Sequence, residues 1–307
     1  MNESEYGFLL SDRVQKIIQI SEKYGLEKNG YVSFSGGKDS TVLHHLIDFA
    51  LPGNKIPRVY CDTGIDFNDI RAFVKGLATT DSRFQIIRPG KNIKAMLEEN
   101  GYPFKSKFHS HICAIYSRQG KSGCVAKYAD SPDLSASTCP KSLKWQFEKP
   151  LDYPISDKCC YKLKKEPFAV YERETGRRIG ITGMRQGEKG LREHLGCLTT
   201  KKGEVARFHP LAPLPDDFMQ MFIERFEVQL CRLYYPPFNF SRTGCKGCPY
   251  NVKLQEELET LQMFLPAERK QCEEIWKPVY ADYRKIGYRL KPSASQFYEK
   301  KQLSLFS

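Results

Sequence analysis

Apolar and polar residues follow one another in blocks that predict strands and helices in turn. Short apolar runs typical of buried strands occur at 30–34, 57–61 and 84–87. Stretches with helical periodicity occur at 12–24, 41–50 and 68–78. Because strands that alternate with helices pair in parallel, this pattern predicts an α/β fold built on a parallel sheet.

The pattern changes after the third strand. From about 109 to 150 the periodicity is lost in a segment rich in Ser, Lys and Cys, which we interpret as a long insertion. Regular patterns then resume, with a strand expected at 178–183 and helices at 186–195, 216–233 and 256–288. We therefore predict three regions: a sheet domain over 1–215 that carries the insertion, a small helical lobe over 216–290, and a flexible tail over 291–307.

Composition and charge narrow the class of protein. The chain has 307 residues, a formal charge of +12 and a pI of about 9.1, a balance that favours anionic partners such as nucleotides or nucleic acid. Met1–Leu10 lacks the basic start and apolar core of a secretion signal, and no apolar run is long enough to span a membrane. Eleven cysteines then favour metal or catalytic use over disulfides, so we expect a cytoplasmic protein with no membrane partner.

A glycine-rich turn, Ser35-Gly36-Gly37-Lys38-Asp39-Ser40, joins the first predicted strand to a helix. The two glycines let the backbone approach an anion, and free N–H groups at the helix start point at it. Lys38 adds a cation, while the hydroxyls of Ser35 and Ser40 can bind phosphate oxygens or an accompanying Mg²⁺. The spacing differs from the Walker loop and resembles the SGGKDS signature of PP-loop ATP pyrophosphatases, which implies that these six residues bind ATP or a related nucleotide.

The second strand ends in Cys61-Asp62-Thr63-Gly64, at the edge of the sheet where ligands of open α/β folds bind. Asp62, Thr63 and Gly64 are therefore candidates for contacts with the nucleotide. An aspartate cap followed by a plain turn would use the same residue types, and the sequence leaves both interpretations open.

Four cysteines form the second candidate site. Cys159 and Cys160 are adjacent, and Cys245 and Cys248 form a CxxC motif far downstream. Adjacent thiolates can reach two irons of a cubane, and the CxxC pair can supply the other two, so a 4Fe-4S cluster is the first hypothesis. Such a cluster would hold the sheet domain and the helical lobe together. Zinc and unconnected thiols remain alternatives. Cations that would offset a cluster's charge surround the first pair: Lys158, Lys162, Lys164 and Lys165.

Taken in order, the motifs resemble the phosphoadenosine phosphosulfate (PAPS) and adenylylsulfate reductase family. The resemblance runs from about 30 to 250 and includes the SGGKDS turn, Tyr60–Gly64, Gly101–Lys107, Cys159-Cys160, Lys164–Pro167, Ile181–Arg185, His209–Leu211 and Thr243–Cys248. It implies an adenine nucleotide alpha-hydrolase-like, Rossmann-like domain and a nucleotide of the ATP, PAPS or adenylylsulfate type. It further implies that Lys38, Arg185 and Arg192 act at the anionic end of that nucleotide. A solvated helix face is the alternative for both arginines.

One departure separates this chain from the reductases. They attack the sulfonate with a cysteine in a Glu-Cys-Gly tail, whereas this chain has no cysteine after Cys272. In its features the chain most resembles the cluster-bearing PP-loop ATPases of DNA phosphorothioation, which act in sulfur transfer to DNA.

Two weaker signals lie outside these motifs. Three cysteines and two histidines of the insertion could form a second metal site or be scattered residues: Cys113, Cys124, Cys139, His109 and His111. The tail segment Gln302–Phe306 resembles the peptide with which bacterial proteins bind the DNA sliding clamp. A strap packed on its own domain is the alternative.

Three functions follow. The first is an enzyme that cleaves ATP to pyrophosphate and activates a substrate, favoured to be nucleic acid, for sulfur transfer. The second is reduction of a sulfonucleotide by a thiol from a partner protein or from the insertion, with a thiol reductant or sulfur donor protein as partner. The third is a non-catalytic, nucleotide-gated module associated with DNA.

Overall fold

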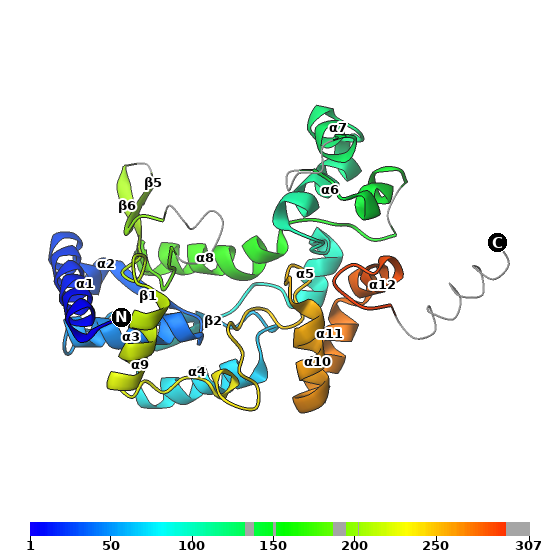
Figure 1. Cartoon of the computed structure of the whole chain (residues 1–307). Helices are drawn as coiled ribbons and strands as arrows, with labels where there is room; N and C mark the ends of the chain where they lie inside the picture. Colours follow the sequence, from blue (N-terminus) through cyan, green and yellow to red (C-terminus); the bar gives the residue numbers. More distant parts are fainter. Residues whose placement is uncertain (133–137, 150–151, 187–194, 202, 293–307) are drawn as a thin grey trace. The chain divides into compact units, whose positions relative to one another are not determined.

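The computed structural model describes residues 1–132, 138–149, 152–186, 195–201 and 203–292 (Figure 1). The chain divides into two compact units, and each unit combines two separate segments of sequence. Unit 1 comprises Met1–Pro89 and Glu166–Gly244, and unit 2 comprises Gly90–Lys165 and Cys245–Ser307. This division differs from the predicted boundary at 215. The helix that follows residue 215 packs in the core of unit 1, and the CxxC motif opens the second segment of unit 2.

Unit 1 is built on one six-stranded sheet with the order β3-β2-β1-β4-β6-β5. The strands are β1 (Gly30–Phe34), β2 (Arg58–Cys61), β3 (Phe84–Ile87), β4 (Ile179–Ile181), β5 (Leu198–Lys201) and β6 (Glu204–Phe208). All neighbouring strands pair in parallel except β5, which is antiparallel to β6. The predicted α/β fold with a mostly parallel sheet is therefore confirmed.

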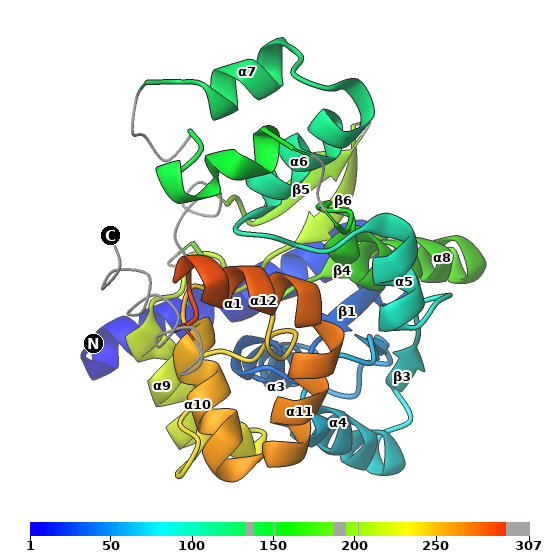
Figure 2. The ribbon, with the colours of Figure 1, turned by 90° about the vertical axis from the view of Figure 1, so that its right-hand side faces the viewer.

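Helices cover both faces of this sheet (Figures 1 and 2). The helices of unit 1 are α1 (Glu3–Tyr24), α2 (Leu26–Asn29), α3 (Lys38–Ala50), α4 (Asn68–Thr80), α8 (Glu166–Thr175), α9 (Asp216–Arg225) and the short η3 (Arg232–Tyr234). The main core joins α1, α3 and α9 to one face, where Val32 of β1 is buried. The preceding residue, Tyr31, points to the opposite face of the sheet and packs on Phe168 and Tyr171 of α8. Apolar residues on both sides of β1 thus fix it at the centre of the sheet.

Unit 2 is helical. It contains α5 (Ile93–Asn100), α6 (Lys107–Gln119), α7 (Gly123–Ala129), η1 (Lys141–Phe147), the π-helical turn η2 (Tyr161–Lys165), α10 (Leu254–Phe264), α11 (Pro266–Ile275) and α12 (Lys277–Ile286). Its two sequence segments share one core. The ring of Phe104 lies 4.7 Å from that of Tyr283, whose hydroxyl also accepts a hydrogen bond of 2.7 Å from the backbone N–H of Lys105.

Several predicted elements need correction. The segment 109–150 is not irregular, because α6, α7 and η1 lie within 107–147. The Ser106 side chain caps the first of these helices by accepting from the N–H of His109, a capping signal that the Ser-rich composition concealed. The helix predicted over 216–233 ends at Arg225, since Glu227 is in the left-handed region with φ of 47°.

Other boundaries also differ. The first helix begins at Glu3 instead of residue 12, because Asn2 and Glu5 form a capping box. The stretch 256–288 forms three helices, and Pro266 and Pro278 stand in the first turns of the second and third. The hairpin of β5 and β6 was not predicted. The helix expected at 186–195 and the tail at 291–307 fall largely outside the described residues. None of the described helices is both long and apolar enough to cross a membrane.

Candidate nucleotide and thiol sites

Three neighbouring strands of unit 1 place the predicted nucleotide motifs at one edge of the sheet. β2, β1 and β4 are adjacent and parallel, so their carboxyl ends lie together. The glycine turn follows β1, Asp62 follows β2, and Thr182-Gly183-Met184-Arg185 follows β4. This edge is where open α/β sheets bind their ligands.

The turn after β1 has a shape that requires glycine. Gly36 has φ of 71°, and a Cβ added to it would lie 2.9 Å from a methyl carbon of Ile70 and 3.0 Å from one of Val74. Helix α4 therefore supports the turn from behind and leaves no room for a side chain.

Helix α3 starts at Lys38 without a side-chain cap. The N–H of Lys38 donates to the Tyr234 hydroxyl at 3.0 Å, and that hydroxyl lies 2.7 Å from the hydroxyl of Thr243. Among the described residues, the N–H groups of Asp39 and Ser40 have no hydrogen-bond partner. Amides of this kind, together with the helix dipole, form an anion-binding site.

Arg185 joins the loop after β4 to the same helix start. Its side chain is buried, its Nη2 lies 2.5 Å from Asp216 Oδ1, and its Nε lies 3.5 Å from Asp39 Oδ1. The hydrogen bond from Arg185 lowers the pKa of Asp216. Arg185 Nε and Asp39 Oδ1 are buried atoms that make no hydrogen bond within the described part of the chain. Each therefore keeps bonding capacity that a nucleotide or its metal ion can use.

Gly183 explains why this loop lies so close to α3. A Cβ at this position would lie 3.0 Å from the carbonyl carbon and oxygen of Asp39 and 3.2 Å from the Ser40 nitrogen. The loop therefore contacts the backbone of the glycine turn directly. Arg192, the other predicted arginine, lies outside the described residues, and its role stays a prediction.

Asp62 is held within unit 1 by an arginine of α4. Arg71 Nε lies 3.0 Å from Asp62 Oδ1, and Arg71 Nη2 donates to Oδ2 at 3.1 Å. Thr63 donates to Asp66 through its hydroxyl at 2.8 Å and through its N–H at 3.1 Å, and the N–H of Gly64 donates to Asp62 at 3.2 Å. This local bonding is that of an aspartate turn, and a contact of these residues with a nucleotide stays a prediction.

Some site residues were missed by the sequence reasoning. Tyr234 lies on η3 and touches the glycine turn, and Arg71 and Asp66 organise the turn after β2. His209, which is buried, lies 2.7 Å from the Thr182 hydroxyl through its Nδ1. Thr243 and His209 belong to motifs already noted, whereas no local pattern marked Tyr234.

The four predicted cluster cysteines all belong to unit 2, so they do not join two lobes. Cys159 and Cys160 stand at the start of the helical turn that precedes η2, with their sulfurs 4.0 Å apart. Cys159 donates to Cys160, and this bond, followed by the charges of Lys107, Lys164 and Lys165, lowers the pKa of Cys160 to about 6. The pKa of Cys159 is raised by the same bond, by burial and by the nearby Cys160, Cys248 and Cys245 thiols. The thiols of Cys245 and Cys248 therefore affect the pKa of Cys159.

The CxxC turn is held in place by side chains of α10, α11 and α12 and the residues at their ends. Gly247 has φ of 60°, and its N–H donates to Glu257 Oε1 at 2.6 Å. Three carbonyls of the turn accept hydrogen bonds from aromatic side chains: Trp276 to Lys246, Tyr280 to Gly247 and Tyr283 to Pro249. Burial raises the pKa of Cys248, while the N–H of Tyr250 donates to its sulfur. The backbone around both thiols is therefore rigidly fixed.

Among the described residues, no three or more His, Cys, Asp or Glu side chains are placed to hold a metal ion in this structure. The second metal site is not formed. Both ring nitrogens of His109 are engaged, by the Tyr128 hydroxyl at 2.8 Å and by Gln146 Oε1 at 2.7 Å. His111 instead lies 3.5 Å from Asp157, and Cys124 is exposed. For the four cysteines, the donor set itself fits a cluster: four free thiols of unit 2, two of them adjacent in sequence and two on a preformed turn.

Comparison with known proteins gives one family. The family model "Phosphoadenosine phosphosulfate reductase domain" matches residues 29–122 and 121–251. An uncharacterised protein from Methanocaldococcus jannaschii is 32% identical over 114 residues, which are 34% of this chain and 27% of that protein. The aligned segment thus spans about a quarter of this relative.

Three solved structures are similar to this chain at low identity. The phosphoadenylyl-sulfate reductase of Candida auris, in a phosphate complex, is 13% identical with a TM-score of 0.43, over 80% of this chain and 96% of that chain. The U34-tRNA thiolase NcsA of Methanococcus maripaludis, with its [4Fe-4S] cluster, is 14% identical with a TM-score of 0.38, over 92% and 80%. The NH3-dependent NAD synthetase of Campylobacter jejuni is 13% identical with a TM-score of 0.40, over 92% and 96%.

Proposed function

The chain belongs to the phosphoadenosine phosphosulfate reductase domain family, and on this basis we propose that it is a PP-loop enzyme. It binds ATP, or a related adenylyl nucleotide, and releases pyrophosphate in order to activate a substrate for sulfur transfer. Nucleic acid is the favoured substrate, in keeping with the net charge of +12.

The uncapped start of α3 is the observation that carries this proposal. The N–H groups of Asp39 and Ser40 remain available there, next to the Gly36 turn, and Lys38 adds a full positive charge. An ATP polyphosphate meets both requirements of the site, which are many acceptor oxygens and negative charge.

The charged side chains of the site suit an attack on the α-phosphate of ATP. An oxygen of the substrate attacks the α-phosphorus, the bond to the β-phosphate oxygen breaks, and pyrophosphate leaves. Lys38, at the start of α3, and Arg185, which pairs with Asp39 there, would stabilise the negative charge that develops, and Arg192 is assigned the same role from its motif. Asp39 Oδ1, which makes no hydrogen bond within the described residues, would hold Mg²⁺ together with phosphate oxygens.

Cys159, Cys160, Cys245 and Cys248 would hold a 4Fe-4S cluster within unit 2. When bound, the cluster supplies either a site that carries sulfur or a structural link between the two segments of the unit. The lysines whose charges act on Cys160 would offset the charge of four thiolates. Anaerobic purification should give a brown protein with about four irons per chain, and a colourless, zinc-loaded protein would contradict this assignment.

One assay separates the candidate functions. The protein is incubated anaerobically with ATP or with PAPS, with DNA or tRNA present, and pyrophosphate and sulfite are measured side by side. We expect pyrophosphate from ATP, and its loss in Lys38→Ala but not in Lys75→Ala, an exposed lysine of α4. A protein that binds ATP without ever releasing pyrophosphate would be a binding module and not this enzyme.

Sulfonucleotide reduction is the second candidate, favoured by one observation. Cys124 is a free, exposed thiol in the segment between the nucleotide motifs. In this reaction a thiolate attacks the sulfonate sulfur, the nucleoside phosphate leaves, and a second thiol, from thioredoxin or glutathione, releases sulfite and forms a disulfide. Sulfite from PAPS that disappears in Cys124→Ser would establish this function. If Cys124→Ser still released sulfite, the attacking thiol would belong to another cysteine.

A further inference from the structure

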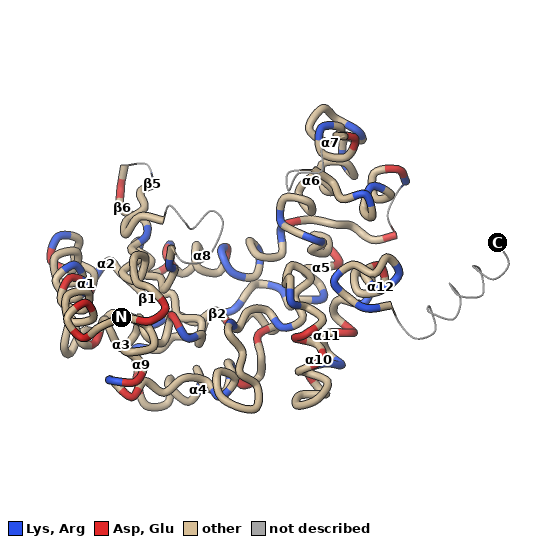
Figure 3. Tube along the Cα trace, in the orientation of Figure 1, with Lys and Arg blue, Asp and Glu red and all other residues tan. Residues whose placement is uncertain are grey.

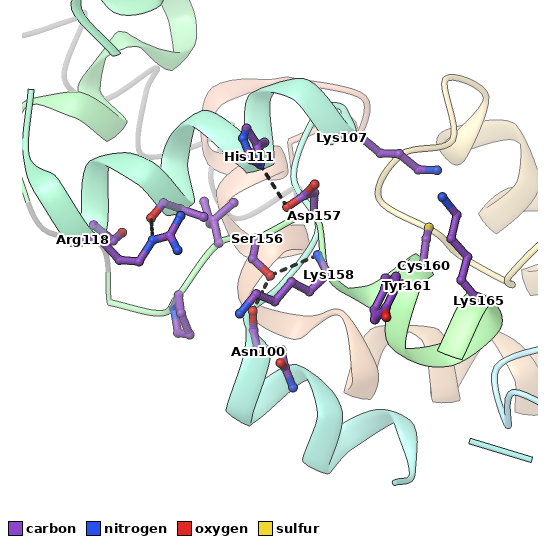
Figure 4. A pocket seen from close by; sticks show the side chains of 14 residues that line it. Asn100, Lys107, His111, Arg118, Ser156, Asp157, Lys158, Cys160, Tyr161 and Lys165 are labelled. Carbon is purple, nitrogen blue, oxygen red and sulfur yellow. Dashed lines mark hydrogen bonds and ion pairs between the residues drawn. The ribbon is translucent and has the colours of Figure 1, made fainter. Parts of the chain in front are cut away.

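Unit 2 contains a cavity of about 570 Å³ that is open to solvent (Figure 4). Its wall is formed by α6, by the end of α5 and by the segment 154–165. Its charged or titratable lining residues are Lys107, His111, Arg118, Asp157, Lys158, Cys160, Tyr161 and Lys165. Neither the glycine turn nor the CxxC turn contributes to this wall.

The cavity wall is strongly basic. Four of the lining residues are Lys or Arg, and the one carboxylate, Asp157, lies 3.5 Å from His111. Within the described part of the chain, the ammonium groups of Lys107, Lys158 and Lys165 have no ion-pair partner. In the same unit, by contrast, acidic residues gather along α10 and α11 (Figure 3). Unpaired cations that share one concave wall attract an anion.

The cations extend along the cavity instead of surrounding one point. Lys107 and Arg118 stand at opposite ends of α6, eleven residues apart, which corresponds to about 16 Å along a helix axis. This spacing is larger than one inorganic phosphate or sulfate ion. A chain of phosphate groups matches it.

Two further lining residues, Cys160 and Tyr161, distinguish this cavity from a simple basic patch. Figure 4 shows the side chains of Lys107 and Lys165 converging near the Cys160 sulfur, in agreement with their electrostatic effect on that thiol. Tyr161 lies next to them with 52% of its surface exposed. An exposed aromatic ring beside phosphate-binding cations is the arrangement with which proteins bind single-stranded nucleic acid, because bases stack on the ring.

We propose that this cavity binds the sugar–phosphate backbone of a single-stranded nucleic acid segment, with a base stacked on Tyr161. Lys107, Arg118, Lys158 and Lys165 contact successive phosphates, and the bound strand passes beside Cys160. The inference rests on the proposed function only for the role of this strand as sulfur acceptor. Binding itself depends on the cavity alone.

The test measures binding of fluorescently labelled 20-nucleotide DNA and RNA strands to the full chain as a function of salt. In Arg118→Gln/Lys158→Gln, we expect the slope of log K against log salt to fall by about 1.4, or about 0.7 for each lost phosphate contact. Tyr161→Ala should weaken binding about tenfold or more. The matched control is Lys270→Gln/Lys277→Gln, which removes the same charge from exposed positions on α11 and α12.

Each outcome bears on the cavity. Unchanged affinity and slope in the cavity variant, or equal losses in the control variant, would overturn the proposal. Full displacement of the strand by millimolar inorganic phosphate would also overturn it, in favour of a small-anion pocket. Tighter binding of a duplex than of either strand would exclude the single-stranded ligand. Pyrophosphate release and iron content are measured in the same samples, so a failed ATP reaction with intact strand binding refutes the enzyme and leaves the cavity standing.

Discussion

Replacing Gly247 with alanine should dismantle the CxxC turn. The new methyl group would lie 2.5 Å from the Tyr280 hydroxyl, 2.7 Å from the Cys272 sulfur and 2.8 Å from Cys272 Cβ. All these atoms belong to fully buried side chains, and Tyr280 is further fixed by its hydrogen bond to the Gly247 carbonyl. No flexible side chain can move aside, so the backbone between the two cysteines must shift.

The expected cost has two parts. A left-handed conformation, here with φ of 60°, disfavours alanine by about 1–2 kcal/mol. Overpacking of a filled core costs about 1–3 kcal/mol more. We therefore expect Gly247→Ala to lower the free energy of unfolding by about 2–5 kcal/mol. Gly244→Ala is the matched control, because Gly244 has no atom within 4 Å of an added Cβ and is exposed. Its effect should stay within about 0.5 kcal/mol.

Urea unfolding followed by tryptophan fluorescence reports on this site, since both tryptophans, Trp145 and Trp276, lie in unit 2. Iron per chain after anaerobic reconstitution is the second readout, and we expect it to fall sharply in Gly247→Ala. Equal unfolding midpoints and equal iron content in the two glycine variants would refute the reasoning. Lost stability with full iron content would show that the turn supports the fold but does not carry cluster ligands.

Three further predictions concern unit 1. Gly183→Ala places a methyl 3.0 Å from the Asp39 backbone and should weaken ATP binding about tenfold or more, measured by calorimetry against Gly7→Ala, which meets no atom within 4 Å. Arg185→Lys keeps the positive charge but cannot pair with both Asp39 and Asp216 as the guanidinium group does. Pyrophosphate release should therefore fall while the unfolding midpoint changes little. Normal turnover would exclude Arg185 from the reaction. Burial, followed by the nearby Arg58, lowers the pKa of His44 to about 4, so between pH 6.5 and 4 the unfolded chain binds a proton that the folded chain does not. Stability should thus fall as the pH drops through this window, by up to about 1.4 kcal/mol per pH unit, and an identical pH profile in His44→Gln would contradict this.

The sequence predicted the sheet well because the apolar runs of the strands and the position of the glycine turn indicated the same elements. The strands expected at 30–34 and 84–87 match β1 and β3, and the glycine turn lies between a strand and a helix as its signature requires. Buried parallel strands appear as continuous apolar runs, and the glycines of a phosphate-binding turn stand out in any composition. Local signals of this kind survive without knowledge of the rest of the fold.

The sequence failed where distant contacts decide the outcome. The predicted boundary at 215 differs from the division into units 1 and 2, because α9 looks like the start of a new lobe until its packing on α1 and α3 is known. Tyr234 was missed for the same reason, since only the folded chain brings its hydroxyl to the N–H of Lys38. The helices of 107–147 carry many polar residues, and the segment that leads into them packs on a residue remote in sequence, since the ring of Phe104 contacts that of Tyr283.

The interleaved segments also set an order of events during synthesis. When the ribosome has made residues 90–165, their packing partners from Cys245 onward do not yet exist, although residues 1–89 can begin to fold. Completion of the sheet must wait for 166–244, and the CxxC turn gains the side chains that hold it only after Glu257, Trp276 and Tyr280 have emerged. A chain released before residue 245 would contain Cys159 and Cys160 without the CxxC turn. If the proposed cluster is bound, its iron content would therefore record whether the chain had been completed.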